Sequence, residues 1–145
     1  MIVEWSMLPS LAGKVVMVDG SFDPLHDGHI AYFEASVSLG MPVFCNITSD
    51  DWTSKKHPVL LPQFQRARVI DAIRHIEYVH CSTRSTKSVL EQLQPHTYVK
   101  GADWRDRGGI PKPEAEICEK LGIKVEYVDT VLNSSTQLIR QLKDS

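Results

Sequence analysis

Two histidines three residues apart, His26 and His29, end the most informative segment of the chain, GSFDPLHDGH at residues 20–29. An apolar run at residues 15–18 precedes the segment, and a helical pattern at residues 30–39 follows it. This order predicts a buried strand, a tight loop and a helix N-terminus, where free N–H groups and the helix dipole favour a phosphate. Two imidazoles beside that phosphate predict chemistry on it, although an isolated pair could simply cap the helix.

Attack on a phosphorus atom adds negative charge to its equatorial oxygens. Hydrogen-bond donors aimed at those oxygens stabilise the transition state more than the ground state. Gly20 lets the backbone turn at the strand end. The Ser21 hydroxyl and the Phe22 backbone can contact a phosphate group, and Asp23 can orient either the loop or a second substrate. The loop therefore has the groups needed to bind and activate a phosphate group.

A second anion site is predicted at the start of the last helix. The run of hydroxyl side chains there, Ser134, Ser135 and Thr136, suits a further phosphate group, and ordinary N-capping is the alternative.

Alternating strand and helix patterns must position these groups. Strands are predicted at residues 15–18, 43–48, 78–81, 97–99 and 125–128, and helices at 30–39, 63–74, 86–93, 113–121 and 135–142. Strict alternation predicts an α/β fold with a doubly wound, Rossmann-like, five-stranded parallel sheet. Ligands bind at the carboxyl ends of the strands in such sheets, which is where the informative loops fall.

Composition excludes several function classes. At 145 residues we expect a single domain over residues 1–145, with residues 1–13 as an N-terminal extension that packs on its own domain or on a partner. The net charge of −2 argues against nucleic acid, and no apolar run is long enough for a membrane span. The three cysteines lack C-x-x-C spacing, so we expect neither disulfides nor zinc, and a cytoplasmic location.

Three segments carry a family resemblance. His26-Asp27-Gly28-His29 resembles the H-x-G-H signature of the nucleotidyltransferase superfamily related to class I aminoacyl-tRNA synthetases. The NSST run at residues 133–136 resembles the second signature of that superfamily. The VKGADW segment at residues 99–104 resembles one branch, which includes glycerol-3-phosphate cytidylyltransferases and the adenylyltransferase domain of ADP-heptose synthesis. The resemblance covers residues 14–142.

The resemblance implies an enzyme, a nucleotidyltransferase of the EC 2.7.7 type. Catalytic roles fall to His26, His29, Lys55 and Lys56. Nucleotide binding falls to Gly20, Ser21, Phe22, His26, His29, Lys100, Gly101, Asp103, Ser134, Ser135 and Thr136. Acceptor binding falls to Asp23, Arg66 and Trp104. No residue is assigned as a metal ligand, because Mg²⁺ is expected to be held mainly by the triphosphate.

The nucleotide and the acceptor stay open within this reaction class. Asp129 and Leu132 stand where glycerol-3-phosphate cytidylyltransferases carry arginine and glycine. This departure favours an ATP-dependent, heptose-1-phosphate-type adenylyltransferase over a glycerol-3-phosphate-type cytidylyltransferase. The other alternative is a non-catalytic nucleotide-binding module. The expected partners are an NTP and a small phosphorylated sugar or polyol, and relatives often form homodimers.

Overall fold

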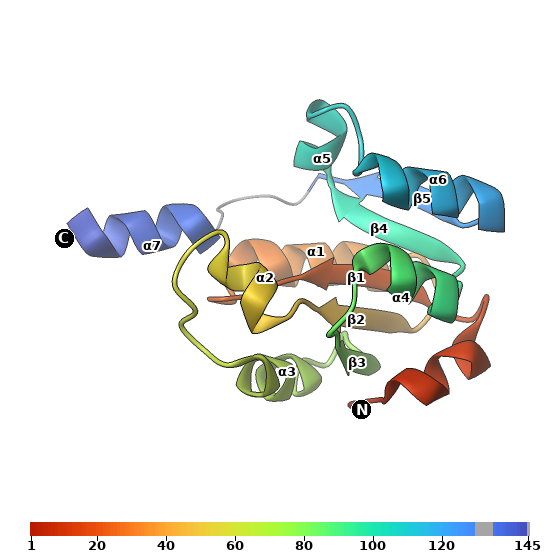
Figure 1. The fold of residues 1–145 in the computed structure, drawn as a ribbon, viewed down its shortest axis with the longest axis horizontal. Helices are drawn as coiled ribbons and strands as arrows, with labels where there is room; N and C mark the ends of the chain where they lie inside the picture. Colours follow the sequence, from red (N-terminus) through yellow and green to blue (C-terminus); the bar gives the residue numbers. More distant parts are fainter. Residues whose placement is uncertain (130–134, 145) are drawn as a thin grey trace.

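Five parallel strands form the centre of the fold, in the order β3-β2-β1-β4-β5 (Figure 1). The computed structural model describes residues 1–129 and 135–144. The strands are β1 (Val16–Gly20), β2 (Val43–Ile47), β3 (Tyr78–Cys81), β4 (Thr97–Gly101) and β5 (Lys124–Val128). Every pairing is parallel, and β1 lies at the centre. The predicted fold class is therefore confirmed, because the strand order reverses direction at β1 as a doubly wound sheet requires.

Helices follow most strands. They are η1 (Trp5–Leu11), α1 (Asp27–Val37), α2 (Asp50–Ser54), α3 (Gln63–Asp71), α4 (Thr86–Leu93), α5 (Ala102–Asp106), α6 (Lys112–Leu121) and α7 (Ser135–Asp144). The five predicted helices are present, while η1, α2 and α5 are additional short elements. Within residues 1–129 and 135–144, every helix is too short or too polar to cross a bilayer.

The sheet has an apolar core on each face. Residues from α1 and α3, such as Phe33 and Ile70, pack on one face against Val18 and Cys45. The other face is covered by η1, α4 and α6, which contribute Leu8, Leu90 and Ile117, and this side packs on Met17, Phe44 and Tyr98. Alternate residues of one strand thus serve opposite cores, as the pleat of a strand requires.

The N-terminal extension packs on its own domain. Leu8 is fully buried, and the Val3 N–H donates to the Val79 carbonyl at 2.8 Å. The Arg84 guanidinium lies over the Trp5 ring, and the distance from its Cζ to the ring centroid is 3.9 Å. Figure 1 shows this segment beside β3. Of the two placements that the sequence allows, the structure has the intramolecular one.

A row of polar side chains ends the core on the α4 and α6 face. Strand register places Asn46 between Asp19 on β1 and His80 on β3, and it pairs Lys100 with Tyr127. These residues lie two positions beyond Met17, Phe44 and Tyr98, so they share that face. We call these five residues, His80, Asn46, Asp19, Lys100 and Tyr127, the polar row. It crosses the sheet at the carboxyl ends of the strands.

Candidate active site

The two histidines cap α1 through their own side chains. His26 is the N-cap, and its Nδ1 accepts from the Gly28 N–H at 3.1 Å. His29 is the third helical residue, and its Nδ1 accepts from the His26 N–H at 3.1 Å. This reciprocal arrangement is a capping box made of two imidazoles. Because each Nδ1 accepts, each neutral ring carries its proton on Nε2.

Electrostatics keep both rings neutral. The rings stack with centroids 3.7 Å apart. Burial lowers the pKa of His29 to about 3, and the neighbouring His26 adds to this effect. Burial also lowers the pKa of His26, against an opposing contribution from Asp27. Both side chains are therefore neutral Nε2–H donors at physiological pH.

The His26 donor lacks an acceptor. Its Nε2 is buried and has no hydrogen-bond partner among the residues that the structure describes. A buried unpaired N–H is costly, on the order of 1–3 kcal/mol, and a ligand oxygen would remove that cost.

Phe22 and Gly20 shape the loop by packing. The Phe22 ring is buried and meets the His29 ring edge-on, with centroids 4.9 Å apart. A Cβ on Gly20 would lie 3.1 Å from the Phe22 ring. The sequence predicts glycine here for a backbone turn. The structure shows instead that glycine makes room for this ring, which fixes the His29 imidazole.

Hydroxyl groups join the loop to β2 and α2. Ser21 Oγ lies 2.8 Å from Thr48 Oγ1, and Thr53 Oγ1 donates to Ser21 Oγ at 3.0 Å. Ser21 is half-buried. Its predicted contact with a triphosphate stays a prediction.

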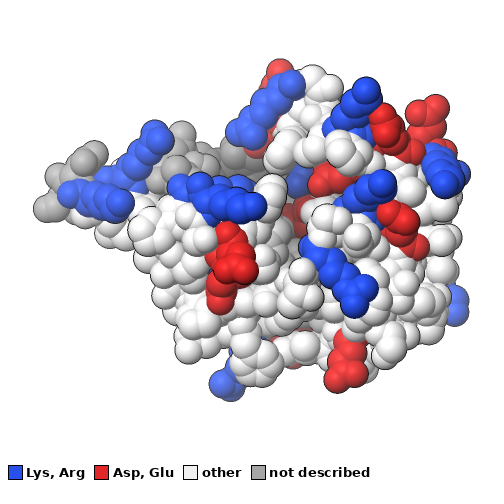
Figure 2. Space-filling model, viewed as in Figure 1, with Lys and Arg blue, Asp and Glu red and all other residues white. Residues whose placement is uncertain are grey.

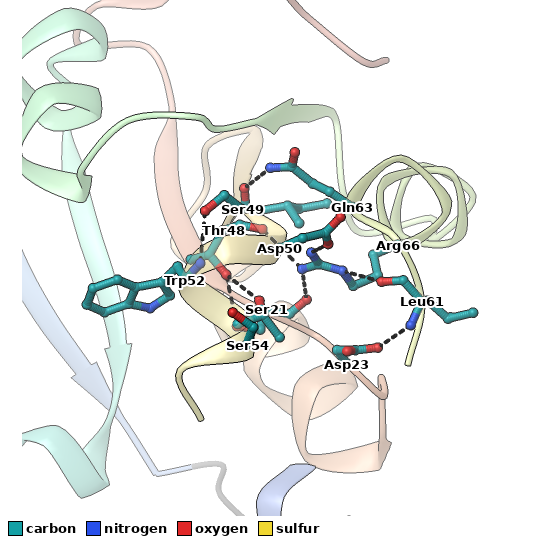
Figure 3. Close-up of polar contacts among 12 residues, drawn as sticks. Ser21, Asp23, Thr48, Ser49, Asp50, Trp52, Ser54, Leu61, Gln63 and Arg66 are labelled. Carbon is teal, nitrogen blue, oxygen red and sulfur yellow. Dashed lines mark hydrogen bonds and ion pairs between the residues drawn. The ribbon is translucent and has the colours of Figure 1, made fainter. Parts of the chain in front are cut away.

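Asp23 and Arg66 hold the loop between α2 and α3 (Figure 3). Asp23 is fully buried, and its carboxylate accepts from the N–H groups of Leu60 and Leu61 at 2.8 and 2.9 Å. The Arg66 side chain is fully buried, and its Nη2 pairs with Asp50 Oδ1 at 2.6 Å. Its other nitrogens donate to the carbonyls of Leu61, Ser21 and Thr48. The polar atoms of Asp23 and Arg66 are thus used inside the protein. Their predicted acceptor binding stays a prediction.

The two predicted lysines directly follow α2, and their side chains have different surroundings. Lys55 Nζ lies 5.1 Å from the centroid of the Trp52 ring. Lys56 is exposed at the surface, and partial desolvation lowers its pKa. The positive charge of Lys100 lowers this pKa further, whereas Asp19 opposes the shift. The catalytic roles predicted for both lysines stay predictions.

A buried ion pair lies at the switch point of the sheet. Lys100 Nζ lies 2.8 Å from Asp19 Oδ1, and the Tyr98 hydroxyl donates to Asp19 Oδ2 at 2.8 Å. Lys100 Nζ also lies 4.7 Å from the Trp104 ring centroid. Asp19 balances the charge of Lys100 and fixes its ammonium. Sequence reasoning missed Asp19, although a carboxylate between a buried apolar run and Gly20 was the available signal.

The remaining predicted residues fall into two groups. Gly101 and Asp103 form the N-cap and first turn of α5, where Asp103 pairs with Arg107 at 3.7 Å. Ser134 lies outside the described residues, and so do the side chains of Ser135 and Thr136 that begin α7. Their predicted nucleotide contacts stay predictions.

A cavity of about 480 Å³ opens at the carboxyl ends of β2 and β3. It lies between α2 and the N-termini of α4 and α6, and Figure 2 shows the surface hollowed there, with charges of both signs around the hollow. Its lining includes Asn46 and Glu114, which the sequence did not single out, together with the predicted Lys55. Among the described residues, no cluster of three or more His, Cys, Asp or Glu side chains could hold a metal ion.

Comparison with known proteins identifies the family of this chain. The sequence model of a family described as cytidylyltransferase-like matches residues 17–141. Curated relatives include the Bifunctional protein HldE of Geobacter metallireducens, 32% identical over 128 residues, and that of Magnetococcus marinus, 33% identical over 132 residues. The alignments cover 85% and 88% of this chain but 25% and 26% of the relatives. The chain thus spans about a quarter of the length of the curated relatives that it matches.

Two solved structures share the fold. The lipopolysaccharide core biosynthesis protein from Thermoplasma volcanium has a TM-score of 0.67 at 20% identity, covering 81% of this chain and 97% of that chain. Pantoate-beta-alanine ligase from Francisella tularensis has a TM-score of 0.61 at 12% identity, covering 97% and 72%. At these identities the likeness concerns the fold alone.

Proposed function

The chain belongs to the cytidylyltransferase-like family and is a nucleotidyltransferase, and from that premise we propose that it transfers an NMP group from an NTP to a sugar phosphate or polyol phosphate. The favoured reaction is of the heptose-1-phosphate adenylyltransferase type. The relatives named Bifunctional protein HldE, which carry the adenylyltransferase domain of ADP-heptose synthesis, support this choice. Asp129 supports it too, because it stands where the cytidylyltransferase branch carries arginine and is paired with Arg105 at 3.3 Å.

One observation carries the proposal: two neutral imidazoles at the start of α1 both present Nε2–H, and that of His26 has no partner among the described residues. A site that only binds phosphate gains most from full positive charge. Neutral, preorganised donors instead stabilise charge that develops during the reaction.

The reaction needs no protein nucleophile. An oxygen of the acceptor phosphate forms a bond to the α-phosphorus, the bond from that phosphorus to the bridging oxygen of the β-phosphate breaks, and pyrophosphate leaves with that electron pair. His26 and His29 donate to the α-phosphate oxygens as negative charge builds on them. Lys56 and Lys100 offset the charge of the phosphates, and Mg²⁺ would be held by phosphate oxygens and water.

The test is a pyrophosphate-release screen that crosses ATP, CTP, GTP and UTP with heptose, hexose, ribitol, erythritol and glycerol phosphates. We expect release with ATP and a sugar 1-phosphate. Replacing His29→Ala should lower kcat by about 10²–10³-fold, since one preorganised donor is lost.

The matched control is His75→Ala, which makes the same chemical change before β3, at the amino-terminal edge of the sheet. It should leave kcat within about twofold, and circular dichroism should show both variants folded. A folded His29→Ala protein with unchanged turnover would exclude the transition-state role. Nucleotide binding without turnover across the whole panel would favour the non-catalytic module.

A further inference from the structure

A buried polar atom without a hydrogen-bond partner lies in the lining of the cavity at the carboxyl ends of β2 and β3. Asn46 belongs to the polar row, lines the cavity and is 1% exposed. Its Oδ1 is buried and has no hydrogen-bond partner among residues 1–129 and 135–144. Interchanging the amide oxygen and nitrogen would place an unpaired buried N–H at the same point. In either orientation, a buried polar atom of Asn46 therefore lacks a hydrogen-bond partner.

The side chains beside Asn46 on the neighbouring strands do not donate a hydrogen bond to its Oδ1. On one side, His80 Nδ1 is used by the Val3 carbonyl at 3.0 Å. On the other side, Asp19 accepts from Lys100 and Tyr98. A buried acceptor left unpaired in this way is costly, so a ligand hydroxyl that donates to it gains more than a hydroxyl on an open surface.

Glu114 supplies a second polar group to the same cavity. It lies in the first turn of α6 and is hydrogen-bonded to Thr86, the first residue of α4. Burial, together with the negative charge of Asp19, raises its pKa to about 7, although Lys100 opposes the shift. The carboxyl group is therefore held between two helices, facing the polar row, and can accept from or donate to a hydroxyl.

The walls suit a polyhydroxylated molecule. Six hydroxyl side chains line the cavity: Thr48, Ser49, Ser82, Thr83, Ser85 and Thr86. Trp52 and two prolines, Pro111 and Pro113, add apolar surface. A sugar or polyol presents hydroxyl groups together with C–H faces, and the volume of about 480 Å³ lies in the range of small-molecule sites.

We propose that this cavity binds the polyhydroxylated part of the acceptor, and that Asn46 and Glu114 are the specificity-determining residues that hydrogen-bond its hydroxyl groups. The inference rests on the proposed function and deepens it, because it names which part of the acceptor the cavity takes. Lys55 also lines the cavity, so its positive charge is available to the phosphate of the same substrate.

The decisive variant is Asn46→Leu, which keeps the shape and removes the polar atoms. The KM for heptose 1-phosphate should rise about tenfold or more, because a buried hydrogen bond to the substrate is lost. The KM for ATP should stay within about twofold. The unliganded protein should become no less stable, because the unpaired acceptor is also gone. A purely structural role for Asn46 would instead lower stability and affect both substrates alike.

Two comparisons sharpen the result. Glu114→Gln, which keeps a hydrogen-bonding group, should raise the KM for heptose 1-phosphate less than Glu114→Leu does. Methyl phosphate, which lacks the polyol, should react equally poorly with wild type and Asn46→Leu. The control Gln65→Leu removes an amide from the exposed side of α3 and should change neither KM.

Each outcome decides between the two proposals. If wild type turns over and Asn46→Leu changes no acceptor KM, or raises the KM for ATP instead, the inference is wrong and the proposed function stands. If wild type releases no pyrophosphate, the proposed function fails. Calorimetric titration with heptose 1-phosphate then tests the cavity alone: weaker binding to Asn46→Leu supports the inference, and equal or no binding overturns it.

Discussion

At the scale of single residues, the two histidines of α1 cap the helix with one ring nitrogen and leave the other nitrogen for the proposed chemistry. Each Nδ1 satisfies a backbone N–H of the first helical turn, and each Nε2 is left as a donor. The cap therefore fixes the tautomer that the proposed chemistry needs. The spacing of His26 and His29 predicts a phosphate site, but this coupling between capping and tautomer becomes visible only in the structure.

The low pKa of His29 predicts a dependence of stability on pH. The folded value of about 3 lies below the ordinary 6.5, so the fold favours the neutral ring. This contribution is complete above pH 6.5 and is lost as the pH falls toward 3, because the unfolded state takes up the proton first. Between pH 6.5 and 5 the loss should be about 2 kcal/mol.

The measurement is urea unfolding of wild type and His29→Gln at pH 7 and pH 5. Glutamine at the third helical position keeps the capping interaction but does not titrate. The free energy of unfolding of the variant should fall less on acidification than that of wild type. An equal fall in both proteins would show that His29 is not held neutral.

At the scale of elements, the segment between β2 and α3 depends on buried polar residues from outside it. Arg66 joins this segment to the first loop, since its guanidinium contacts carbonyls of both and pairs with Asp50 (Figure 3). The segment carries Lys55 and Lys56. Arg66 thus helps to fix the position of the segment that carries both lysines.

Replacing Arg66→Met should therefore lower stability, by about 3–5 kcal/mol, because the buried carbonyls and Asp50 lose their partner. Thermal unfolding of Arg66→Met and of the control Arg68→Met, on the same helix but exposed, measures this effect. Arg66→Lys should retain part of the stability. An Arg66→Met protein of unchanged stability with a raised acceptor KM would instead support direct binding of the acceptor by Arg66.

The elements show what sequence can and cannot predict. Continuous apolar runs located the strands, and β3 and α4 have the predicted bounds. The prediction ended β1 at Val18, whereas the ladder with β2 continues through Asp19 and Gly20. Strand pairing prolongs β1 through residues that lack apolar character. The internal contacts of Arg66 and Asp23 could not be predicted, because most of their partners are backbone groups that only the folded chain brings near them.

At the scale of the whole molecule, the domain core begins before the part of the chain that matches the family. The match starts at residue 17, yet Leu8 and Leu11 belong to the core on the α4 and α6 face. Trp5 adds a contact with Arg84, which lines the cavity. The N-terminal extension thus stabilises the side of the sheet where the cavity opens.

Truncating Leu8→Ala should cost about 2–5 kcal/mol, because its side chain is fully buried. Leu60→Ala is the control, since Leu60 is 48% exposed, and it should cost less than about 1 kcal/mol. Chemical denaturation of the two variants checks the difference. Equal, small losses would mean that the extension is not part of the cooperative core.

The two histidines and the two proposed specificity residues lie on opposite faces of the sheet. The histidines belong to α1, which packs on the face of Val18 and Cys45, whereas Asn46 and Glu114 lie on the face covered by α4 and α6. Altering the second face need not disturb the first, because the strands between them are fixed by their hydrogen-bond ladder. For directed evolution, this arrangement recommends a small library confined to positions 46, 86 and 114. Such a library would search for new acceptors while every member keeps the two histidines and their helix unaltered.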